Sequence, residues 1–86
     1  MNIIPMEEYM PYYLFVNSQM VVNKIIKEKK YSEMKAYSEF LDSQTYRMCS
    51  DIKLSMWDIS PYDIYNMWDY EKTNKKDPRE LLEKLI

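Results

Sequence analysis

The chain has 86 residues, a net charge of −2, and neither glycine nor histidine. This length suits one domain with a modest core, and a hydrophobic fraction of 47% argues against disorder. Without glycine there is no phosphate-binding loop or dinucleotide fingerprint. Without histidine there is no Ser-His-Asp or Cys-His catalytic group and no Cys/His zinc site. We therefore predict a protein without enzymatic activity, with no catalytic residue, no metal and no cofactor.

Cysteine use and hydropathy bear on where the protein resides. The single cysteine, Cys49, excludes an intramolecular disulfide framework and is expected to be a small core side chain. The most apolar stretch, residues 12–26, is too short and too polar to span a bilayer. Residues 1–8 are acidic and carry no cleavage pattern. These features predict a cytoplasmic protein with no membrane contact.

The first thirty residues give two competing signals. Pro5 can open a short helix over residues 6–13, which Pro11 would kink or end. β-Branched side chains within residues 12–26 permit a hairpin as well as a helix. We prefer a helix over residues 18–29, because a hairpin turn without glycine is unusual.

Lysines gather after this segment, and the net charge over residues 24–35 is +3. This cluster could contact phosphate, but we interpret it as a polar helix end with lysines near the negative pole of the helix dipole. The lysines are Lys24, Lys27, Lys29, Lys30 and Lys35.

A long central helix is predicted over residues 32–57, with Ser32 as its N-cap. Apolar residues recur there at steps of three and four, which is helical spacing. The stripe consists of Met34, Tyr37, Leu41, Met48, Ile52 and Met56, with Thr45 filling one gap. Its methionines, together with Met67, are expected in the core.

Two further helices carry proline near their starts. Ser60 can cap a helix over residues 61–73, and Ile59 and Ile64 occupy the positions of a hydrophobic staple. Asp77 and Pro78 repeat this pattern for a helix over residues 78–86. The fold class expected for residues 1–86 is therefore all-α: a small single-domain helical bundle of four or five helices.

The candidate functional segment is residues 54–71, which have a net charge of −4 and five aromatic side chains. Tyrosine and tryptophan are enriched at interface hot spots, and acidic residues around them would suit a basic groove on another protein. We name the predicted partner-binding residues the acidic-aromatic surface: Trp57, Asp58, Tyr62, Asp63, Tyr65, Asp69 and Tyr70. Spacing puts Tyr62, Tyr65 and Asp69 on one side of the helix. The alternative is that these aromatics form the core, where Trp57 and Trp68 are mostly expected.

The function predicted is a protein-binding module. Lysine outnumbers arginine ten to two, which indicates an AT-rich genome and suits a small phage or viral protein that inhibits a host nucleic-acid-handling or defence protein. One alternative is a phage assembly or chaperone-like factor. The other is a nucleic-acid-binding regulator using residues 32–57 and 61–73 as a helix-turn-helix, but an acidic recognition helix has the wrong charge. Self-association as a homodimer is also plausible.

Overall fold

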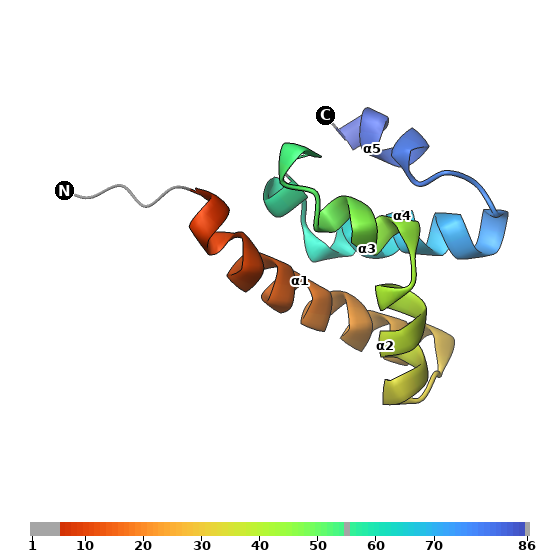
Figure 1. Ribbon diagram of the computed structural model, residues 1–86. Helices are drawn as coiled ribbons and strands as arrows, with labels where there is room; N and C mark the ends of the chain where they lie inside the picture. Colours follow the sequence, from red (N-terminus) through yellow and green to blue (C-terminus); the bar gives the residue numbers. More distant parts are fainter. Residues whose placement is uncertain (1–5, 55, 86) are drawn as a thin grey trace.

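The computed structural model describes residues 6–54 and 56–85, and the elements formed by these residues are all helical (Figure 1). The α-helices are α1 (Met6–Lys29), α2 (Glu33–Leu41), α3 (Gln44–Cys49), α4 (Pro61–Asn74) and α5 (Arg79–Leu85). Two short 3₁₀ helices, η1 (Ile52–Leu54) and η2 (Met56–Asp58), lie between α3 and α4. The prediction of an all-α fold with four or five helices is confirmed.

α1 runs along one side of the molecule and packs against α2 and α4, while α3 packs against α4 (Figure 1). The core lies between them, and apolar burial there is the main source of stability. Its buried members are Val21, Val22, Ile25, Ala36, Phe40, Met48, Met56, Ile64, Tyr65, Met67, Trp68 and Leu82. Among the described residues, no helix is long and apolar enough to cross a membrane.

The N-terminal segment is one continuous helix, which excludes the hairpin and confirms the helix expected over residues 18–29. The break predicted near Pro11 is wrong, since Pro11 lies inside α1. Met10 is buried on the same side of α1 as Val21 and Ile25. Apolar side chains on this face of α1 are buried before and after Pro11. Their burial offsets the loss of the one backbone hydrogen bond that the proline cannot donate.

The prediction of one central helix over residues 32–57 is also wrong, because the helix is interrupted at Asp42 and Ser43. Ser43 has an extended backbone and is fully buried. Its hydroxyl donates to the Phe40 carbonyl at 2.5 Å and accepts from the Tyr46 N–H at 3.1 Å. One side chain thus forms hydrogen bonds with both the end of α2 and the start of α3, so few hydrogen bonds are lost at the interruption.

The break changes which side chains enter the core. Ala36 and Phe40 are buried from α2, whereas Met34 is 83% exposed and Leu41 is 47% exposed. The core position predicted for Met34 is therefore wrong. The other methionines assigned to the core, Met48, Met56 and Met67, are buried as expected. The side chain of Ile52 lies outside the described part of the structure.

The local start signals of the last two helices are confirmed. The Ser60 hydroxyl accepts from the Asp63 N–H at 3.2 Å, and Pro61 opens α4. An Asp77 carboxylate oxygen accepts from the Arg79 N–H at 3.0 Å at the start of α5. Ile59 packs against the core cluster that contains Ile64, as a staple requires.

Two lysines occupy positions at which other proteins commonly place glycine. Lys30 follows α1 with φ of 59°, and Lys75 follows α4 with φ of 57°. This left-handed backbone ends a helix by turning an N–H back onto it, and the Lys30 N–H reaches the Ile26 carbonyl at 3.0 Å. A chain without glycine therefore ends two of its helices on lysine.

Candidate partner-binding surfaces

The acidic-aromatic surface predicted on α4 is divided by its contact with α1. Tyr65 is only 7% exposed and packs beside Trp68, with ring centroids 6.0 Å apart. Asp69 forms an ion pair with Lys29 of α1 at 2.5 Å, and this hydrogen bond raises the pKa of Lys29. Tyr65 and Asp69 therefore belong to the packing between α1 and α4 and offer little to a partner. Trp68, at 1% exposed, is a core residue as expected.

Lysines of α1 supply much of the positive charge that the acidic-aromatic segment was expected to find on another protein. Lys24 Nζ lies 5.0 Å from the ring centroid of Tyr62 and 5.2 Å from that of Tyr65. Such cation–π contacts are favourable by about 0.5–1 kcal/mol at exposed sites. Part of the lysine cluster thus makes intramolecular contacts, in which Lys24 and Lys29 hold α1 against α4.

A smaller part of the acidic-aromatic surface remains accessible. Tyr62 is 61% exposed, Asp58 is exposed and Asp63 is half-buried. The Tyr70 hydroxyl donates a hydrogen bond to the Glu80 carboxylate of α5 at 2.5 Å, and this bond raises the pKa of Tyr70. The side chain of Trp57 lies outside the described part of the structure. The accessible part is therefore Asp58, Tyr62 and Asp63, which come from η2 and the first turn of α4.

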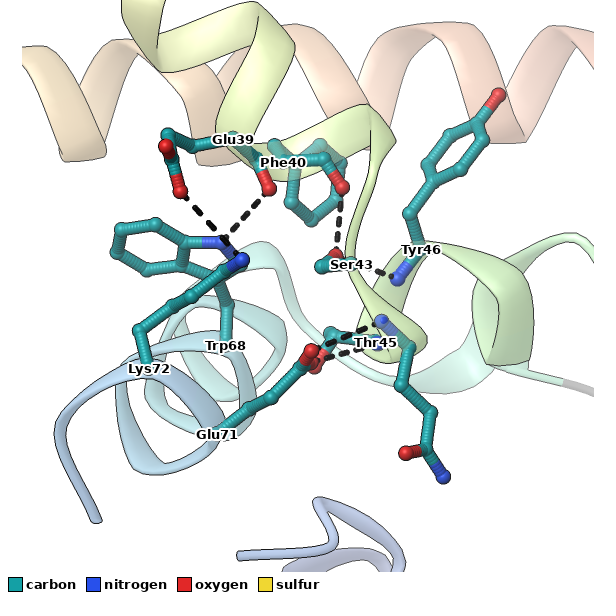
Figure 2. A network of polar contacts seen from close by, with 9 residues as sticks. Glu39, Phe40, Ser43, Thr45, Tyr46, Trp68, Glu71 and Lys72 are labelled. Carbon is teal, nitrogen blue, oxygen red and sulfur yellow. Dashed lines mark hydrogen bonds and ion pairs between the residues drawn. The ribbon is translucent and has the colours of Figure 1, made fainter. Parts of the chain in front are cut away.

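Glu71, the remaining acidic residue of the segment, accepts hydrogen bonds from the start of α3 (Figure 2). One carboxylate oxygen accepts from the Gln44 N–H at 2.9 Å, and the other accepts from the Thr45 N–H at 2.9 Å and from its hydroxyl at 2.8 Å. With the Ser43 hydroxyl on the Tyr46 N–H, the first three N–H groups of α3 are satisfied. A negative charge at this helix end is also favourable to the helix dipole.

Next to Glu71, two further contacts join α2 to α4 (Figure 2). The indole N–H of Trp68 donates to the Glu39 carbonyl at 3.4 Å. The Glu39 carboxylate pairs with Lys72 at 3.4 Å. No buried side-chain nitrogen or oxygen lacks a hydrogen-bond partner in the part of the chain that the structure describes. The polar groups on this side therefore hold helices together.

Among the described residues, the largest group of exposed apolar side chains lies on α1, outside the predicted partner-binding residues. Tyr12 is 66% exposed, Phe15 is 69% exposed and Met20 is 52% exposed. Tyr9 and Tyr13 of the same helix are exposed at 43% and 38%. The aromatic density of residues 9–15 was the available signal. The hairpin alternative for this segment obscured which side chains face outward.

A shallow apolar groove of about 330 Å³ lies beside this group, between α1 and the α2–α3 segment. Phe15, Tyr37 and Leu41 are among its large side chains, and the others are Pro11, Leu14, Ser18, Gln19 and Tyr46. None of the described residues that line it is charged. Its size and apolar lining fit one or two apolar side chains of a protein rather than a charged small molecule.

Two observations bear on catalysis and metal binding. Cys49 is half-buried against the core, and burial raises its pKa to about 12, so its thiol is protonated at neutral pH. Over the described ranges, no three Cys, Asp or Glu side chains are grouped to hold a metal ion.

Comparisons with protein-family models, curated proteins and solved structures find no match for this chain.

Proposed function

We propose that this protein is a non-enzymatic protein-binding module. The observation that carries the proposal is the set of exposed aromatic side chains on α1 beside the apolar groove that α1 forms with α2 and α3. Exposed aromatic side chains grouped around a concave apolar surface are characteristic of interface hot spots, where few residues provide most of the binding energy.

The occupant of the groove is a partner protein that inserts an apolar side chain. Phe15 of α1 and Leu41 of α2 both line the groove, and both expose a large part of their surface to water in the free protein. Covering these side chains removes apolar area from water at about 25 cal/mol per Å². A lining without charge favours an apolar anchor over a lysine or a phosphate.

The accessible part of the acidic-aromatic surface provides a second proposed contact. Asp58 and Asp63 flank the exposed Tyr62 in a short stretch of the chain. They would attract a basic edge on the same partner, mainly by speeding encounter and selecting the correct protein. This contact is smaller than the one first expected, because Tyr65 and Asp69 are engaged by α1.

The biological setting follows from the composition. An AT-rich coding sequence and a small single domain fit a phage or viral protein that acts in the host cytoplasm by binding and inhibiting a host protein. A phage assembly or chaperone-like factor would use the same groove. Direct nucleic-acid binding is the least supported role, because Lys24 and Lys29 are engaged with α4 and the net charge is −2.

Photo-crosslinking in the native host tests this proposal. A photoreactive amino acid replaces Phe15 at the groove, Tyr62 at the acidic-aromatic surface, or Met34 as the control. Met34 is apolar and 83% exposed but does not line the groove. We expect one host protein to be captured from position 15 and not from position 34. The proposal would be contradicted if the host protein were captured equally from positions 15 and 34. It would also be contradicted if no host protein were captured from position 15 and none from position 62.

A further inference from the structure

α1 carries a second apolar surface, on the side opposite the core and distinct from the groove. Tyr9, Tyr12, Val16 and Met20 lie along it at steps of three and four residues, and the same line continues through Asn23 and Lys27. Val21, Val22 and Ile25 on the opposite side of α1 are fully buried. We call residues 9, 12, 16, 20, 23 and 27 the outer stripe of α1.

The outer stripe is apolar at one end and basic at the other, and this asymmetry indicates what covers it. Glu8 is exposed at the start of the helix, while Lys27 and Lys30 are exposed at its end. Neither Glu8 nor Lys27 takes part in any ion pair found among the described residues. A second copy of α1 lying antiparallel would bring the acidic end of each helix to the basic end of the other.

The register of such a pair follows from the positions themselves. A two-fold axis near residue 18 places Val16 opposite Met20 of the other copy, Tyr12 opposite Asn23, and Tyr9 opposite Lys27. A self-complementary patch of this kind is what a two-fold dimer requires. Tyrosine beneath lysine already recurs in the monomer, where Lys24 lies over Tyr62 and Lys35 lies 4.2 Å from the ring centroid of Tyr31.

We propose that this protein forms a homodimer in which the outer stripes of two α1 helices pack antiparallel, with Glu8 and Tyr9 of each copy against Lys27 of the other. The α1 residues that line the groove, among them Pro11, Phe15 and Gln19, are not members of the outer stripe, so the dimer leaves the groove open to a partner protein. Antiparallel packing also places each helix dipole against its opposite.

Cysteine crosslinking tests the arrangement, using a Tyr12→Cys chain mixed with an Asn23→Cys chain. Positions 12 and 23 face each other across the proposed axis, so the mixed disulfide should form. Two copies of position 12 lie about 18 Å apart along the helices, too far for a disulfide. Both chains also carry Cys49→Ala, so that the native thiol cannot form a competing disulfide. A Tyr12→Cys disulfide between identical chains, or no crosslink, would overturn the antiparallel arrangement.

Charge reversal tests the ion pairing, with the dimer dissociation constant measured by sedimentation equilibrium up to about 1 mM protein. Glu8→Lys and Lys27→Glu should each weaken dimerisation about fivefold, since each creates two repulsive contacts. The double variant should return to within about twofold of the original value. Glu83→Lys, on the exposed face of α5, changes the net charge as Glu8→Lys does, and as the control for that variant it should have no effect.

The outcomes separate this inference from the proposed function. A chain that stays monomeric up to the highest concentration overturns the dimer, as does a double variant that fails to restore dimerisation. Capture of a host protein from position 15 is a separate measurement on a different side of α1. A monomer that still captures a host protein keeps the proposed function and discards the dimer, and a dimer without capture does the reverse.

Discussion

Glu71 and Thr45 are 26 positions apart in the chain, yet a single carboxylate oxygen of Glu71 accepts both the backbone N–H and the hydroxyl of Thr45. Thr45 is fully buried, so its hydroxyl depends on this one acceptor. The contact fastens the start of α3 to the third turn of α4. It makes Glu71 the polar side chain on which the α3–α4 packing most depends.

Removing Glu71 should therefore be costly. Glu71→Ala leaves the Thr45 hydroxyl and two helix-end N–H groups without their acceptor, and the free energy of unfolding should fall by about 2–4 kcal/mol. Glu71→Gln keeps one acceptor oxygen and should cost about half as much. Urea denaturation measures both. Glu83→Ala on α5 is the control, and a loss of equal size there would show that the Glu71 contacts contribute little.

The two tyrosines of the α4 surface should respond in opposite ways to truncation. Tyr65→Ala removes a buried ring beside Trp68 and should lower the free energy of unfolding by about 3 kcal/mol. Tyr62→Ala removes a ring that is 61% exposed, and it should cost under about 1 kcal/mol. Thermal unfolding of the two variants compares them. Similar losses for both would mean that α1 does not cover Tyr65 as described.

Glycine should stabilise this protein at the two positions where the backbone is left-handed. Lys30→Gly and Lys75→Gly remove the steric cost that a side chain imposes at positive φ, which exceeds the added entropy of the unfolded chain. Each should raise the free energy of unfolding by about 0.5–1 kcal/mol. Lys76→Gly, at the next position and without positive φ, is the control and should be neutral or destabilising.

The Cys49 thiol should make the fold sensitive to alkali. Burial raises the pKa of Cys49 from 9.0 to about 12, so the folded protein holds this proton more tightly than the unfolded chain does. The resulting stability is fully present below pH 9 and is lost as the pH rises toward 12. The raised pKa values of Tyr65, by burial, and of Lys29, by its hydrogen bond to Asp69, act in the same direction.

Two measurements check this pH dependence. Urea midpoints should fall steadily between pH 9 and pH 11, and Cys49→Ala should reduce the slope. Burial raises the pKa of Cys49 to about 12, so at pH 8 the folded protein holds far less thiolate than the unfolded chain, and a disulfide reagent should react far more slowly without urea than with it. Equal rates would show that the thiol is not buried.

The parts of the fold that sequence reasoning found are those encoded by neighbouring residues. Ser60, Pro61 and Asp63 lie within four positions, and they locate the start of α4 without reference to any other element. The same holds for Asp77 at the start of α5. Local capping chemistry can be recognised from the chain alone, because both partners of each hydrogen bond are close in sequence.

The parts that were missed depend on distant contacts. Asp42 and Ser43 are turn and capping residues, but the apolar spacing on either side of them outweighed that signal. The burial of α1 comes from α2, η2 and α4, which the chain reaches later. For the same reason the contacts of Lys24 with Tyr62 and Tyr65, and of Lys29 with Asp69, could not be seen from the sequence.

The capping of α3 from another helix also bears on the order in which the chain folds. α3 has six residues, well below the length at which an isolated helix is stable in water. Two of its first N–H groups are satisfied only by Glu71, which belongs to the third turn of α4. We expect α3 to form together with α4 or after it, so that substitutions at Thr45 change the unfolding rate more than the folding rate.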